Sequence, residues 1–166
     1  HKWLYAPIGS GMLYVKKDKI KTLYPLFASN NPQKDDIRKF EHLGTRPFYI
    51  EQAIGKAIEF HDMLGAARKE KRLHYLKNYW MEKVKDLPGI RLNTSLHADY
   101  GCAIGNIGFE GKDPSELDRF LLDKYKVHAV AMKWENMRGL RVTPNVYTTA
   151  ANLDVLVEGI RAYAKS

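Results

Sequence analysis

The sequence predicts an α+β fold, in which helices cover one side of a small sheet. Two observations support this. A long helical pattern occupies residues 48–88, and after Pro88 the pattern becomes strand, strand, helix, strand, strand, helix. We therefore expect three parts: a partial domain at residues 1–47, long connecting helices at 48–88 and a small α+β domain at 89–166.

Residues 1–47 contain too few strand signals to close a core alone. Residues 6–11 combine proline with two glycines and are expected to form a turn, followed by a short strand from Met12 to Val15. Residues 17–27 are amphipathic and leave the element type open, and residues 30–36 are expected to be a polar loop.

The central helices are predicted by apolar residues spaced three or four apart. Gly65 is expected to end the first helix or to kink the helical segment, and Pro88-Gly89 is expected to end the second helix. The predicted buried faces are, in the first helix, Ile50, Ile54, Ala57, Ile58, His61 and Leu64, and in the second, Leu73, Leu76, Trp80, Val84 and Leu87.

The small domain has strong local signals. Asp113 is a predicted helix cap, with Pro114 in the first turn and the helix continuing to about Tyr125. A final helix is expected from about Thr149, with Leu153, Leu156, Val157 and Ile160 facing inward. Strands are expected at residues 90–94, 102–109, 127–132 and 140–143.

Composition narrows the function classes. The chain has 166 residues, 45% hydrophobic and 28% charged, as in a globular protein, and no apolar run approaches the roughly 20 residues that span a bilayer. The single cysteine, Cys102, argues against a disulfide framework and a cysteine-based zinc site and fits a reducing compartment. The histidines show no metal-ligand spacing, so no metal site is expected.

The net charge of +8 raises the question of an anionic partner such as nucleic acid. The basic residues form two separate groups, Lys16–Lys21 and Arg68–Arg72, and the second falls in a helical pattern where a solvent face is expected. A solvated surface is therefore favoured, with no nucleic-acid or membrane partner. The chain begins with His1, so we expect its natural N-terminus to precede it; a targeting signal could not be seen here.

The first fifteen residues, HKWLYAPIGSGMLYV, resemble the cofactor-lysine segment of the class V aminotransferases, a family of enzymes that use pyridoxal 5'-phosphate. A lysine amine can form a Schiff base, the internal aldimine, with the aldehyde of that cofactor. The resemblance gives this role to Lys2 and places His1 near the cofactor phosphate. A structural histidine is an equally good interpretation of His1.

Two further segments resemble the same family. Gly44-Thr45 precedes the long helix, where the family's Gly-Thr pair binds the cofactor phosphate of the neighbouring subunit. Arg46 could face the site or be a surface residue. Arg141, in Arg141-Val142-Thr143-Pro144, matches the arginine that binds the substrate carboxylate, for which a guanidinium can donate two parallel hydrogen bonds.

The resemblance covers nearly the whole chain and looks most like the isopenicillin-N-epimerase-like branch. It implies the C-terminal part of a fold-type I (α/β) transferase, acting on an amino acid and a keto acid as an aminotransferase or epimerase. It also implies a homodimer in the cytoplasm, and a fragment that is inactive alone. Cys102 is expected to be a buried inert thiol at a strand start, which disfavours desulfurase activity. The alternatives are a non-enzymatic basic binding module for nucleic acid or protein, or a degenerate homologue.

Overall fold

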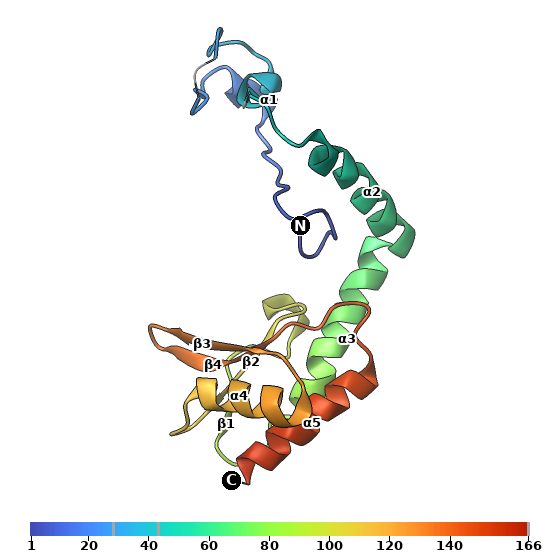
Figure 1. Ribbon diagram of the computed structural model, residues 1–166, viewed down its shortest axis with the longest axis vertical. Helices are drawn as coiled ribbons and strands as arrows, with labels where there is room; N and C mark the ends of the chain where they lie inside the picture. Colours follow the sequence, from blue (N-terminus) through green and yellow to red (C-terminus); the bar gives the residue numbers. More distant parts are fainter. Residues whose placement is uncertain (28, 43, 166) are drawn as a thin grey trace. The chain divides into compact units, whose positions relative to one another are not determined.

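The computed structural model describes residues 1–27, 29–42 and 44–165 (Figure 1). The chain divides into two compact units, unit 1 (His1–Met63) and unit 2 (Leu64–Ser166). The expected boundaries after residues 47 and 88 follow sequence pattern and stay predictions.

Unit 1 consists mostly of turns and irregular segments. Its regular elements are the short helix α1 (Lys17–Ile20), the 3₁₀-helix η1 (Ile37–Phe40) and the long helix α2 (Phe48–Leu64), whose last residue enters unit 2. The strand predicted from Met12 to Val15 is wrong, because no described segment pairs with it and a strand needs a hydrogen-bonded neighbour.

The buried face predicted for α2 is only partly correct. Ala57 is buried, but Ile58 is 46% exposed, and the other predicted positions are half-buried. Among the described residues of unit 1, only Ile20, Lys39 and Ala57 are buried. This agrees with the expectation that the segment cannot close a core alone.

Unit 2 holds a continuous core between a sheet and three helices. The helices are α3 (Ala66–Val84), α4 (Pro114–Tyr125) and α5 (Ala150–Ala164); a 3₁₀-turn, η2 (Ala98–Tyr100), follows the first strand. The strands are β1 (Ile90–Leu92), β2 (Gly105–Phe109), β3 (Val130–Trp134) and β4 (Met137–Val142). They form one antiparallel sheet in the order β1-β2-β4-β3. Helices and strands thus follow the predicted α+β order.

The core lies between the helices and one face of the sheet (Figure 1). Ile107 and Leu140 are fully buried cross-strand partners, and Trp80 of α3 packs against β2. A Cβ atom at Gly105 would lie 2.4 Å from Cζ2 of Trp80, so only glycine fits there. The inward residues predicted for the last helix, Leu153, Leu156, Val157 and Ile160, are all buried, which confirms that face.

The helix boundaries follow their capping residues. Asp113 caps α4, its carboxylate accepting the Ser115 amide at 2.8 Å, and Thr149 caps α5 in a reciprocal capping box with Asn152. Gly65, with φ of 80°, separates α2 from α3. These three predicted helix ends are confirmed.

The strand boundaries differ from those predicted. β1 ends at Leu92 because the next two residues bond to the backbone of Asn106 outside the regular ladder. The Asn93 N–H donates to the Asn106 carbonyl, and the Thr94 hydroxyl accepts from the Asn106 backbone N–H at 3.1 Å. β3 begins late because the Val127 amide donates to Leu121 at the end of α4. β4 begins early because Glu135 and Asn136 form a two-residue turn that pairs Trp134 with Met137.

A solvent face is predicted for the basic group Arg68–Arg72 in α3, and the structure confirms it only in part. Lys69 is buried because it precedes the buried Leu73 by one helical turn. Lys77 is fully buried, and its ammonium donates to the Ser95 carbonyl at 2.6 Å. Burial lowers the pKa of the Lys77 amine. No helix in the described residues is both long and apolar enough to cross a bilayer.

Candidate functional site

Lys2 lies in an exposed turn at the start of unit 1. No described residue forms a hydrogen bond or an ion pair with its amine, so the amine is accessible. Tyr5, with a left-handed φ of 63°, follows in the same turn, and its ring meets Phe60 of α2 edge-on at 5.6 Å. Ser10 closes the next turn, its hydroxyl donating to the Pro7 carbonyl at 2.7 Å. The exposed turn is thus anchored to α2 through an aromatic contact.

Gly44 and Thr45 are both exposed and lie just before α2. Gly44 has a φ of 73°, a conformation that glycine adopts without strain. Arg46, by contrast, is already paired: its Nε donates to Oε1 of Glu51 at 2.5 Å, and this bond raises the pKa of the guanidinium. Of the two roles open for Arg46, the contact with Glu51 favours the surface ion pair.

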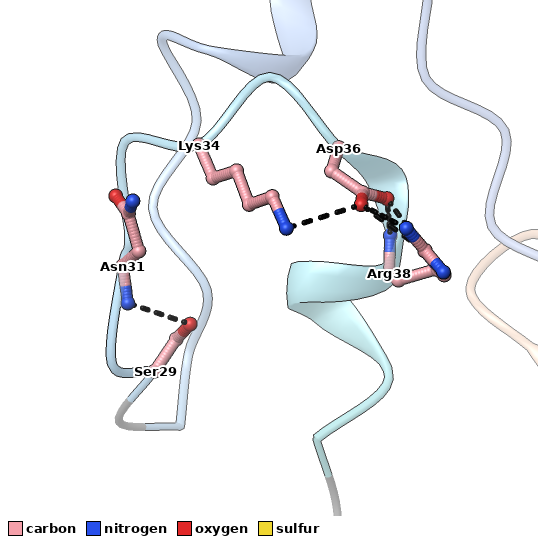
Figure 2. Close-up of polar contacts among 5 residues, drawn as sticks. All are labelled: Ser29, Asn31, Lys34, Asp36 and Arg38. Carbon is pink, nitrogen blue, oxygen red and sulfur yellow. Dashed lines mark hydrogen bonds and ion pairs between the residues drawn. The ribbon is translucent and has the colours of Figure 1, made fainter.

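Two cations, Lys34 in the loop before η1 and Arg38 within η1, surround Asp36 (Figure 2). The Arg38 Nε donates to both carboxylate oxygens of Asp36 and its Nη2 donates to Oδ2 at 2.7 Å, and Lys34 lies 3.5 Å from the same carboxylate. These bonds hold the pKa of Asp36 well below its usual range. The hollow beside them, about 400 Å³, is lined by these two cations, which share the single Asp36 carboxylate.

Arg141 lies in unit 2, on β4, on the sheet face opposite the core. Its register partners are Asn106 on β2 and Val130 on β3, so the three side chains share that face. The Arg141 Nε is buried and has no hydrogen-bond partner in the described part of the chain. No described carboxylate forms an ion pair with this guanidinium, so its positive charge is not neutralised within the described part of unit 2.

A partly buried amide pair beside Arg141 has no counterpart among the sequence predictions. The Asn93 Nδ2 donates to Oδ1 of Asn106 at 2.7 Å and to the Arg138 carbonyl at 3.0 Å. Asn106 is only 5% exposed. No motif marks either asparagine, because they meet through strand pairing between residues thirteen positions apart.

Cys102 differs from its prediction in position, and its low reactivity stays a prediction. It is exposed and precedes β2 by three residues, so it is not buried within a strand. Gly101, which precedes it, lies close to Lys77, whose amine would be 3.6 Å from a Cβ at that position. Partial desolvation of the thiol, with Glu70 nearby, raises the pKa of Cys102. A raised pKa disfavours the thiolate that a nucleophilic cysteine needs.

Lys2, His1, Gly44 and Thr45 lie in unit 1, and Arg141 lies in unit 2. Their roles toward cofactor and substrate therefore stay predictions. Among the described residues, no group of three or more histidine, cysteine, aspartate or glutamate side chains could hold a metal ion.

Comparison with known proteins relates the chain to one family. Residues 1–156 match the sequence profile of the family "Aminotransferase class-V". The chain is 26% identical over 181 aligned residues to isopenicillin N epimerase of Amycolatopsis lactamdurans, covering 99% of this chain and 46% of that protein. It is 25% identical to a probable cysteine desulfurase of Chlamydia trachomatis serovar D, covering 97% of this chain and 44% of that protein. The chain thus spans about half the length of these relatives.

Solved structures show the same fold. The cysteine desulfurase CsdA of Escherichia coli superposes with a TM-score of 0.81 at 18% identity, covering 98% of this chain and 44% of that one. The cystine C-S lyase C-DES superposes with a TM-score of 0.78 at 13% identity, covering 97% and 44%. A C-DES variant carries glycine covalently linked to the pyridoxal phosphate cofactor. The predicted fold-type I architecture is confirmed.

Proposed function

Because the chain belongs to the class V aminotransferase family, we propose that it is part of a pyridoxal-phosphate enzyme that acts on an amino acid by transamination or epimerisation. We further propose that the enzyme is a cytoplasmic homodimer. The observation that carries the proposed action on an amino acid is that the buried Nε of Arg141 has no hydrogen-bond partner among the described residues.

The residues of unit 1 fit the cofactor in their chemistry. The Lys2 amine is exposed and free of any described carboxylate, as a group that condenses with an aldehyde requires. Gly44 and Thr45 can offer backbone N–H groups and a hydroxyl to a phosphate, because both are exposed before the N-terminus of α2. His1 is exposed beside Lys2 and would contribute near the phosphate. In the homodimer, Thr45 would serve the neighbouring subunit.

The residues of unit 2 fit the substrate. Arg141 would bind the α-carboxylate through two parallel hydrogen bonds, which orient the amino acid as well as attract it. The bound cofactor supplies an electron sink for the charge that develops at the substrate α-carbon. The freed Lys2 amine would then remove a proton from that carbon or return it. Transamination and epimerisation both need these steps.

The test of this proposal is the absorbance of the bound cofactor. The natural protein that contains these residues, purified with pyridoxal phosphate, should show a visible absorption band that shifts when an amino acid is added. Lys2→Ala should abolish the band of the covalently held cofactor, because no other amine replaces it. Lys17→Ala, an equally exposed lysine in α1, is the matched control and should keep the band. A band that survives Lys2→Ala would contradict the proposal.

A further inference from the structure

We propose that Asn106 is a second binding residue for the substrate carboxylate, donating a hydrogen bond from its side-chain amide beside Arg141. This inference rests on the function proposed above. It adds a residue from a different strand to the site. Three features of unit 2 support this role: the strand register, the orientation of the Asn106 side-chain amide and the unpaired donors that result.

The strand register places the two side chains together. Asn106 of β2 and Arg141 of β4 are directly opposed in the antiparallel ladder, so both project from the face opposite the core. The Asn106 amide also lies over Gly139, since a Cβ atom there would come within 2.1 Å of Oδ1 of Asn106. Gly139 precedes Arg141 by two residues and therefore lies on the same face of β4.

The hydrogen bonds of Asn93 determine which way the Asn106 amide is turned. The Arg91 Nε can only donate, so the Asn93 atom that it meets at 3.0 Å is the amide oxygen. The Asn93 nitrogen then donates to the Arg138 carbonyl and to Asn106. The Asn106 atom that accepts this bond must be its oxygen, which leaves its NH₂ group on the other side.

The NH₂ group of Asn106 has no acceptor among the described residues, and neither has the buried Nε of Arg141. Two unpaired donors on opposed positions of one sheet face suit an anion better than a neutral ligand. A carboxylate offers about four lone-pair sites, of which a bidentate arginine uses two. Asn106 can donate to a third. Two donors on different strands would also restrict how the carboxylate rotates.

Asn106→Asp tests this directly. The aspartate has the same shape and still accepts the Asn93 hydrogen bond, but it replaces the donor with a negative oxygen beside Arg141. The apparent dissociation constant is measured from the cofactor absorbance of the natural protein, with L-alanine and L-cysteine against ethylamine and cysteamine, which lack the carboxylate. We expect amino-acid affinity to fall about tenfold to a hundredfold, with amine affinity unchanged.

Asn152→Asp is the matched control. It adds the same charge to the same unit, and its side-chain oxygen can still accept from Thr149 in the α5 cap. It should leave both affinities unchanged. Should Asn106→Asp fail to fold, Asn106→Ser keeps an acceptor for Asn93, loses the carboxamide donor and should weaken only amino-acid binding.

The outcomes separate this inference from the function beneath it. If the Asn106 variants weaken the binding of amino acid and amine equally, or weaken neither, the proposed role of Asn106 is wrong. If Arg141→Gln still abolishes the preference for amino acid over amine in that case, the proposed function stands. If Arg141→Gln leaves the preference intact, the proposed carboxylate site itself is wrong.

Discussion

At the scale of single residues, the sequence predicted one side chain of the proposed substrate site and missed its neighbour. Arg141 is marked by its local context, because a Thr-Pro pair follows it closely. Asn106 has no such context. It lies beside Arg141 only because β2 pairs with β4, a contact between residues 35 positions apart that depends on register. Such a residue cannot be found before the strands are paired.

Gly139→Ala tests how tightly the Asn106 amide is packed. The new Cβ would lie 2.1 Å from the Asn106 Oδ1 and 2.5 Å from the Ile107 carbonyl oxygen, so side chain and backbone must both shift. We expect the free energy of unfolding of the 166-residue chain to fall by about 1–3 kcal/mol, measured by urea denaturation.

Gly55→Ala is the control for that change, because nothing lies within 4 Å of its Cβ position in α2. It should be neutral or stabilise by about 0.5–1 kcal/mol. An equal response of both variants would show that the space above Gly139 is not restricted.

At the scale of elements, helix ends were predictable and strand ends were not. The ends of α4 and α5 follow from capping residues that lie within a few positions of them, such as Asp113 and Thr149. The strands begin and end where their partners do, and those partners are distant in the sequence. The strand predicted at Met12–Val15 shows the same limit, since its apolar pattern found no described neighbour.

The cap of α4 is expected to make stability depend on pH. Asp113 accepts from the Ser115 amide and pairs with Lys133 at 2.7 Å, and these contacts lower its pKa to about 2. An aspartate in the unfolded chain has a pKa of about 3.9. The ionised Asp113 carboxylate therefore stabilises the folded state fully above roughly pH 4, and this stabilisation is lost as the pH falls through about 2. Asp113→Asn should therefore lower the melting temperature by a few degrees at pH 6 and by clearly less at pH 2, where about half of the carboxyl groups in the folded state are protonated.

Asparagine still caps a helix well, so that variant isolates the charge. Lys133→Gln removes the partner instead and should give a smaller loss, because the charged Asp113 carboxylate still accepts the hydrogen bond from the Ser115 backbone N–H. The two changes together should cost less than the sum of their separate effects. A melting-temperature difference for Asp113→Asn that persists unchanged at pH 2 would contradict the assignment.

At the scale of the whole molecule, the two units differ in how much they bury. Unit 2 has a core of fifteen buried residues that joins helices and sheet, whereas the described residues of unit 1 bury only three. The sequence predicted this difference, because strand signals concentrate after Pro88. How fully each apolar face is covered could not be predicted, since periodicity shows a face but not its partner.

Limited proteolysis of the 166-residue chain should reveal this difference. Segments with few buried contacts open more often, so cleavage should begin within residues 1–63 and leave a resistant product that contains unit 2. Mass spectrometry of the products would locate the cuts. Early cleavage within β2 or α5 would contradict the burial pattern, because both belong to the core.

The uncovered side chains of unit 1 have a consequence beyond the fold. Met12 is 93% exposed and Leu26 is 94% exposed, and they are accompanied by Ile8, Leu13, Tyr14 and Phe27. An apolar surface of this kind, if it stays exposed to solvent, promotes aggregation and recognition by the chaperones and proteases that act on unfolded chains. The lifetime of this polypeptide in a cell therefore depends on whether something shields that surface, however stable unit 2 is.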